Sequence, residues 1–207
     1  GEEGVARDAK LRQAMVSADL AVILDPVDGT WNFAHGLATF GMILAVVRKG
    51  RPVWGVIYDP LLDDWVESDG HESRFVARGQ SRRLGPAPRR SAELLSGYLP
   101  LGLFGQEARR AGALVGAGYA RLNSLRCSAH EYRQLALGHV DFVLSGPVPH
   151  PWDHAAGVLA VTGAGGVSRF MDGGAYDLAR DRGVLISAVS EDVWQRVARD
   201  FADLARG

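Results

Sequence analysis

Apolar residues along the first half of the chain recur with the spacing of β-strands. Five runs rich in Val, Ile, Leu or aromatic residues each have the length of one strand, and they lie at 20–24, 39–48, 52–59, 64–68 and 73–77. Lys49-Gly50 and Asp69-Gly70 stand between consecutive runs, and such pairs favour the tight turns of β-hairpins. The pattern therefore predicts an antiparallel sheet whose first strand, wholly apolar, is buried.

The pattern changes after Gly85-Pro-Ala-Pro88 to strands alternating with helices. We expect strands at 93–99, 120–125, 141–144 and 184–188, and helices at 107–115, 128–138, 153–162 and 193–204. Ser128 and Glu131 have the spacing of a capping box. Before the first strand we expect a loop with a short helix at 9–15. The chain is thus predicted to be a layered α/β protein, with an antiparallel-sheet subdomain at 1–88 and a mixed α/β subdomain at 89–207.

Composition narrows the classes of function. The 207 residues carry a formal net charge of −1, so there is no basic field for nucleic acid or for an anionic membrane. The apolar runs are far shorter than the roughly 20 residues that span a membrane, and no secretory signal opens the sequence. The single cysteine, Cys127, excludes an internal disulfide. We expect a cytoplasmic protein with neither a nucleic-acid nor a membrane partner.

The end of the first strand carries candidate chemistry. Pro26 has no N–H for a sheet ladder, so the strand is expected to end there and to let Asp25 and Asp28 converge. Two carboxylates a few Å apart repel each other unless a cation lies between them. With the carbonyl of Val27, they form an all-oxygen site of the kind that suits Mg²⁺, Mn²⁺ or Ca²⁺. The sequence therefore predicts a metal site in the 1–88 subdomain.

The next two residues, Gly29 and Thr30, add donors for an anion. Glycine permits close backbone approach, and the amides and the hydroxyl here can bind a phosphate group. A plain surface turn is an alternative, because Asp, Pro and Gly are common turn residues. An aspartyl-phosphate phosphatase is another, but Pro26 stands where its nucleophilic aspartate would lie, so we set it aside.

Asp153 is a second candidate position. The stretch His150-Pro-Trp152-Asp153 opens an Ala-rich helical segment, where the helix dipole favours an acidic residue, so capping alone explains this aspartate. The same helix end also faces anions and their counter-ions. The six histidines form no zinc-type pair with a nearby carboxylate. His150 is the histidine nearest to the proposed site in the sequence.

Three separated segments resemble the motifs of one family. They are Gly1-Glu2-Glu3, then Asp25-Pro26-Val27-Asp28-Gly29-Thr30 with Asn32-Phe33, then Trp152-Asp153-x-Ala155-Ala156-Gly157. In this order they are similar to the inositol monophosphatase family of Mg²⁺-dependent, Li⁺-sensitive phosphatases, and the likeness covers nearly the whole chain. The resemblance implies a layered sandwich of the inositol monophosphatase type, a homodimer, and two or three bound Mg²⁺ ions for which Mn²⁺ can substitute.

The resemblance also implies roles for individual residues. One Mg²⁺ would bind Glu2, Asp25 and the carbonyl of Val27 and activate water that Thr30 helps to orient. A second would bind Asp25, Asp28 and Asp153 and stabilise the leaving group. The catalytic residues would thus be Glu2, Asp25 and Thr30. Substrate contacts are implied for Asp28, Gly29, Thr30, Cys127, Ser128, Ala129 and Asp153.

The sequence departs from the family pattern at three places. Relatives carry two long helices and a further acidic residue before the first motif, so we expect an upstream segment to be missing from this chain. The substrate-binding glutamate of relatives falls near Ser145-Gly146-Pro147, and Cys127 stands where relatives have glycine. We expect Mg²⁺-dependent hydrolysis of a small phosphate monoester, with histidinol phosphate, a sugar phosphate or a nucleotide 3′-phosphate as alternatives to inositol phosphate. A non-catalytic member that binds metal or a partner protein is the alternative from another class.

Overall fold

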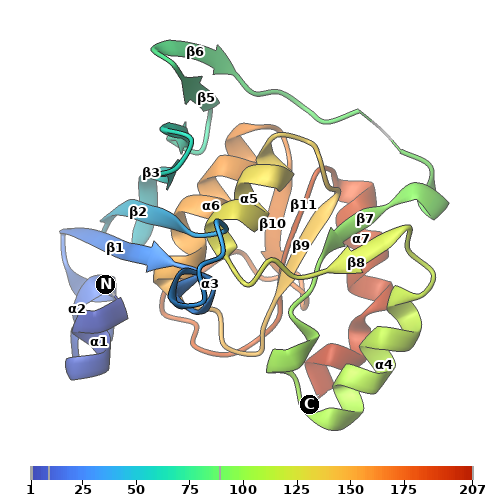
Figure 1. The fold of residues 1–207 in the computed structure, drawn as a ribbon. Helices are drawn as coiled ribbons and strands as arrows, with labels where there is room; N and C mark the ends of the chain where they lie inside the picture. The colour runs from blue at the N-terminus through green and yellow to red at the C-terminus, as the bar shows by residue number, and fades with distance from the viewer. Residues whose placement is uncertain (1, 9, 89, 207) are drawn as a thin grey trace.

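The computed structural model describes residues 2–8, 10–88 and 90–206, except for the side chains of Glu2, Glu3, Ala6 and Arg206. These residues form two β-sheets with helices between and beside them (Figure 1). The predicted layered α/β fold, with an antiparallel sheet followed by a mixed sheet, is confirmed. No helix in this part of the chain is long and apolar enough to cross a membrane.

The first sheet is an antiparallel meander of six strands in chain order. Its strands are β1 (Leu20–Asp28), β2 (Gly41–Arg48), β3 (Arg51–Asp59), β4 (Asp64–Ser68), β5 (Ser73–Ala77) and β6 (Gln80–Arg83). The Lys49-Gly50 turn joins β2 to β3 as predicted, with φ of 50° and 72° at its two residues. Side chains alternate between a buried face, which includes Ile43 and Ile57, and an outer face on which Leu20 and Val22 are exposed.

The second sheet is mixed and has five strands in the order β10-β11-β9-β7-β8. They are β7 (Ser96–Tyr98), β8 (Arg121–Asn123), β9 (Phe142–Ser145), β10 (Val167–Phe170) and β11 (Leu185–Ala188). β7 runs parallel to β8 and β9, whereas β11 runs antiparallel to β9 and β10. β7 is shorter than the strand predicted at 93–99, and a 3₁₀ turn at Ala92–Leu94 precedes it.

Two helices, α5 (Ser128–Ala136) and α6 (Pro151–Gly163), fill the space between the sheets (Figure 1). Small residues allow the close approach of α6 to β3, since a Cβ on Gly55 would lie 2.7 Å from the Cβ of Ala156. The core between the sheets joins Ile43 and Ile57 of the first sheet to Ala156 and to Val143 of the second.

The other face of the second sheet is covered by α4 (Gln106–Gly116) and α7 (Glu191–Asp200). Alternate residues of β9 point to the two sides: Val143 joins the core with α5 and α6, while Phe142 and Leu144 join the core with α4 and α7. The predicted division at residue 88 falls between the last strand of the first sheet and the first strand of the second. The central core combines residues from both sheets. The division into two subdomains stays a prediction.

Short elements complete the fold. They are α1 (Glu2–Arg7), α2 (Lys10–Ser17), α3 (Thr30–Ala34) and 3₁₀ turns at Ala92–Leu94, Leu101–Leu103 and Ala202–Arg206. The short helix expected at 9–15 corresponds to α2, whereas the expectation of a loop before it was wrong, because α1 occupies Glu2–Arg7. Met15 of α2 is buried in a cluster with Ile23 and Val47 of the first sheet and Trp152 of α6, and this packing stabilises the second helix.

Candidate active site

A β-bulge at the end of β1 brings two aspartates to the same face of the sheet. Asp25 pairs with Ile43 and Asp28 with Gly41, so three steps on β1 match two steps on β2. In a regular strand, side chains three positions apart point to opposite faces. The extra residue turns both aspartates inward, where they are 2% and 7% exposed. The strand therefore continues through Pro26, and the expectation that it ends there was wrong.

Asp153 completes a cluster of three carboxylates. It lies in the first turn of α6, and one ligand oxygen from each of Asp25, Asp28 and Asp153 lies within 4.8 Å of the others. Carboxylate oxygens in this arrangement suit a hard divalent cation such as Mg²⁺ or Mn²⁺. These residues therefore fit the metal that the family resemblance implies. Glu2 was expected to add a ligand, but its side chain lies outside the described residues.

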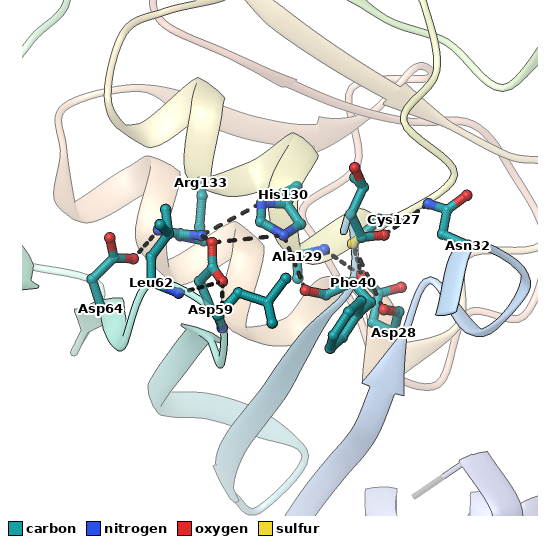
Figure 2. A network of polar contacts seen from close by, with 12 residues as sticks. Asp28, Asn32, Phe40, Asp59, Leu62, Asp64, Cys127, Ala129, His130 and Arg133 are labelled. Carbon is teal, nitrogen blue, oxygen red and sulfur yellow. Dashed lines mark hydrogen bonds and ion pairs between the residues drawn. The ribbon is translucent and has the colours of Figure 1, made fainter. Parts of the chain in front are cut away.

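Asp28 is held by the beginning of α5. Its Oδ2 accepts hydrogen bonds from the backbone N–H of Ala129, at 2.6 Å, and from the thiol of Cys127, at 3.0 Å (Figure 2). Burial raises the pKa of Asp28, and these two donors oppose that rise. A cation at the cluster would oppose it as well, because positive charge favours the ionised carboxyl.

The turn after β1 leaves no room for a side chain at Gly29. This glycine has a φ of 83°, and a Cβ there would lie 2.9 Å from the carbonyl oxygen of Thr39 and 3.1 Å from the Cβ of Cys127. Both the backbone conformation and the close approach therefore require glycine. Its peptide leads directly into α3, whose first residue is Thr30.

Hydrogen bonds within the turn connect its predicted site residues. The hydroxyl of Thr30 donates to the carbonyl of Val27 at 2.9 Å. The N–H of Val27 donates to Asp25 Oδ1 at 3.1 Å. The threonine expected to orient water is thus tied to the carbonyl expected to bind metal.

A cavity of about 450 Å³ opens beside the carboxylates. Of the predicted substrate-contacting residues, Asp28, Cys127, Ser128 and Asp153 belong to its described lining. Ala129, Gly29 and Thr30 do not, and Ala129 is fully buried and serves Asp28 through its N–H. The remaining described lining consists of Pro100, Leu103, Ser124, Arg126, Glu131, Ser145, Gly146, Pro147, Val148, His150 and His154. The volume is typical of a site for a small molecule.

Two histidines on the cavity wall, His150 and His154, are held by contacts with neighbouring side chains, and their pKa values are lowered. His154 Nδ1 lies 3.1 Å from the hydroxyl of Tyr132, and burial lowers its pKa to about 3. His154 is therefore neutral near pH 7. His150 stacks on Trp152 with ring centroids 4.6 Å apart, and its Nδ1 lies 3.5 Å from a guanidinium nitrogen of Arg12. Burial lowers the pKa of His150 as well, and the nearby arginine adds to this effect.

Asn32 braces the cavity wall and was not predicted to do so. Its Nδ2 donates to the carbonyls of Thr39 and Leu125, both at 2.8 Å, and so links the turn after β1 to the loop before α5. The signal in the sequence was its place two positions after the Asp28-Gly29-Thr30 motif. The motif identifies the segment, but the partner 93 positions away is seen only in the folded chain.

Glu131 is a second unpredicted brace. Its Oε1 accepts hydrogen bonds from the N–H of Leu125, at 2.7 Å, and from the hydroxyl of Ser124, at 3.0 Å. Burial raises the pKa of Glu131 to about 7. The predicted capping box was wrong, because Cys127 is the N-cap residue and Glu131 reaches to the preceding loop instead of to Ser128.

A buried ion network fixes α5 against the first sheet. Arg133 of α5 pairs with Asp59, at 2.8 Å, and with Asp64 (Figure 2). His130 Nε2 lies 3.0 Å from the carbonyl oxygen of Phe40. Burial raises the pKa of Asp64, whereas for Asp59 the hydrogen bond from Arg133 and the neighbouring backbone donors outweigh burial and lower it. The network holds the helix whose first turn supports Asp28.

The model of the inositol monophosphatase family matches residues 1–204. This chain belongs to the inositol monophosphatase family. The predicted family membership is thereby confirmed, and family members and relatives are phosphatases that act on phosphate monoesters.

Named relatives differ in what they act on. The bifunctional phosphatase IMPL2 of Arabidopsis thaliana is 34% identical over 151 residues, which cover 72% of this chain and 42% of that protein. The inositol-1-monophosphatase of Mesorhizobium japonicum is 35% identical over 162 residues, covering 73% and 57%. A fructose-1,6-bisphosphatase of Pyrococcus furiosus is 28% identical over 184 residues, covering 87% and 68%. The chain thus spans about half the length of the first two.

Solved structures of the family share the fold. An inositol monophosphatase of Thermotoga maritima superposes with a TM-score of 0.77 at 25% identity, covering 91% of this chain and 71% of that one. Both proteins therefore have the same arrangement of layers. The family defines the architecture and the class of reaction, while the named relatives differ in substrate.

Proposed function

We propose that this protein is a Mg²⁺-dependent phosphatase that hydrolyses a small phosphate monoester with a metal-activated water. The observation that carries the proposal is the convergence of Asp25, Asp28 and Asp153 beside a cavity of about 450 Å³. When bound there, the metal ions would supply positive charge that lowers the pKa of water and stabilises the leaving oxygen.

The residues at the site would bind the metal ions, bind the phosphate group and orient the attacking water. Asp25, Asp28 and Asp153 would hold the cations, with the carbonyl of Val27 and the carboxylate of Glu2 as further ligands. Donors from the start of α5 fix the orientation of Asp28. The amides of Gly29 and Thr30 would bind the phosphate group, and the Thr30 hydroxyl would orient the attacking water. No covalent intermediate with the protein is required.

The candidate substrates are the phosphate esters that the sequence analysis kept as alternatives. Inositol phosphate, histidinol phosphate, a sugar phosphate and a nucleotide 3′-phosphate all have a size suited to the cavity. The stretch Ser145-Gly146-Pro147 lines the cavity where the family resemblance implies a substrate-binding glutamate. Without that carboxylate, the hydroxyl groups of inositol would lack one hydrogen-bond partner. This observation favours an ester other than a simple inositol monophosphate.

Phosphate release from these four kinds of ester, measured with and without Mg²⁺, tests the proposal. We expect turnover of at least one ester that depends on Mg²⁺ or Mn²⁺ and stops with a chelator. Lack of turnover on every ester would contradict the proposal and favour the alternative of a non-catalytic family member that binds metal or a partner protein.

A further inference from the structure

The cavity beside the carboxylates has one permanently positive side chain in its described lining. That side chain is Arg126, in the loop before α5. The other described wall residues are apolar, hydroxyl- or thiol-bearing, acidic, or the histidines His150 and His154. An anionic group of the substrate, away from the reacting phosphate, would therefore have Arg126 as its permanently cationic partner in this lining.

The backbone of Arg126 is held in an unusual conformation. Its φ is 54°, in the left-handed region, which carries an energetic cost for a non-glycine residue. Hydrogen bonds compensate for this cost: the N–H of Arg126 donates to Ser124 Oγ at 3.1 Å, and the neighbouring peptide of Leu125 is bound by Asn32 and Glu131. The surrounding contacts thus determine the direction in which the arginine side chain leaves the loop.

The guanidinium group is also held in place. It lies over the indole ring of Trp31, 3.9 Å from the ring centroid, and this indole stacks on His35 at 4.0 Å. Within the described residues Arg126 makes no ion pair with an acidic side chain. Stacking orients the planar group while leaving its N–H donors available for a carboxylate or a phosphate.

We propose that Arg126 determines specificity by binding a second anionic group of the substrate, a phosphate or a carboxylate. The inference rests on the proposed function, because it assumes that the reacting phosphate lies at Asp28 and Asp153. The preferred substrates are then small phosphate monoesters with a further acidic group. Trp31, on whose indole ring the guanidinium stacks, acts as the positioning residue.

Matched pairs of esters test this assignment. Fructose 1,6-bisphosphate is compared with fructose 1-phosphate and fructose 6-phosphate for a second phosphate, and 2-phosphoglycerate with glycerol 2-phosphate for a carboxylate. We expect kcat/KM to favour the doubly anionic ester in at least one comparison by about tenfold or more, the value of one charged hydrogen-bonded pair. The comparison that shows the preference identifies the group that is recognised.

Variants show whether the preference comes from Arg126. In Arg126→Gln the preference should fall to near one, mainly through KM, and Arg126→Lys should retain part of it because a point charge remains. Trp31→Leu should weaken the preference while the arginine is still present. Arg110→Gln removes the same charge from an exposed position on α4 and should leave the preference unchanged.

Several outcomes would overturn the inference. An equal preference in the wild-type protein and in Arg126→Gln, or no preference in the wild-type protein, would exclude it. An equal loss on every ester in Arg126→Gln would assign the arginine to the reacting phosphate instead. If no ester is hydrolysed, the proposed function fails. The inference is then decided by the dissociation constants of the same esters, measured by calorimetry with Ca²⁺ present, and equal binding within each comparison would contradict it.

Discussion

Asp28 has the contacts of a residue whose charge matters more than its packing. One of its oxygens accepts two hydrogen bonds from the start of α5, and the carboxyl group lies within a cluster of like charges. Repulsion within such a cluster is relieved when a cation binds. The carboxylate is therefore expected to be needed for activity and dispensable for folding.

The variant Asp28→Asn tests this expectation. It keeps an acceptor for the N–H of Ala129 but removes one negative charge, so we expect kcat/KM to fall by at least about 100-fold, as when one charge-stabilising group is removed from an active site. Its far-UV circular dichroism and melting temperature should stay near those of the wild-type protein. Asp181→Asn, at an exposed position before β11, is the control and should keep full activity. Unchanged turnover in Asp28→Asn would contradict the site assignment.

Glu131 predicts a dependence of stability on pH. Its pKa of about 7 in the folded protein lies above its ordinary value of 4.5, so folding favours the protonated carboxyl group. Stability from this group is fully present below about pH 4.5 and is lost as the pH rises through about 7.

We therefore expect Glu131→Gln to be more stable than the wild-type protein at pH 8, by up to about 3 kcal/mol, and similar to it at pH 5. Glutamine cannot ionise but keeps a carbonyl oxygen for the N–H of Leu125 and the hydroxyl of Ser124. Urea denaturation at the two pH values measures the difference. The exposed Glu107→Gln on α4 is the control, and parallel pH profiles for Glu131→Gln and the wild-type protein would argue against an ionisable Glu131.

At the scale of elements, α5 connects the carboxylate cluster to the ion network. Its first turn donates to Asp28, while Arg133 further along the helix joins it to Asp59 and Asp64 of the first sheet. The position of the first turn thus depends on contacts elsewhere on the helix. A substitution in the network should affect the stability of this part of the fold.

Arg133→Met should lower the free energy of unfolding by about 3–5 kcal/mol, because it leaves two buried aspartates without their cation. The triple variant Arg133→Met, Asp59→Asn, Asp64→Asn should recover much of this loss, since no buried charge then lacks a partner. Urea denaturation at pH 7 compares the three proteins. A loss below about 1 kcal/mol in the single variant would show that the network contributes little.

At the scale of the whole molecule, the two sheets share one core through α5 and α6, and the candidate site lies where β1, α5 and α6 meet (Figure 1). The outer face of the first sheet leaves Leu20 and Val22 more than half exposed, at 63% and 58%. The homodimer and the cytoplasmic location stay predictions.

Several features of the fold and of the candidate site were determined by the sequence alone, because they depend on residues that are neighbours in the chain. Alternating apolar positions and the Lys49-Gly50 turn predict the meander, and the acidic turn after β1 predicts a cation site. Family motifs add Asp153, although it is far away in the sequence. Local chemistry and repeated spacing are sufficient for these conclusions.

Other features were decided only by the tertiary structure. The bulge that turns Asp25 and Asp28 to one face depends on the register between β1 and β2. The bond from Asn32 to Leu125 joins residues 93 positions apart. Glu131 has a raised pKa because packing buries it, which no local pattern reveals. Burial, register and long-range hydrogen bonds arise when distant segments meet, so they became visible only in the folded chain.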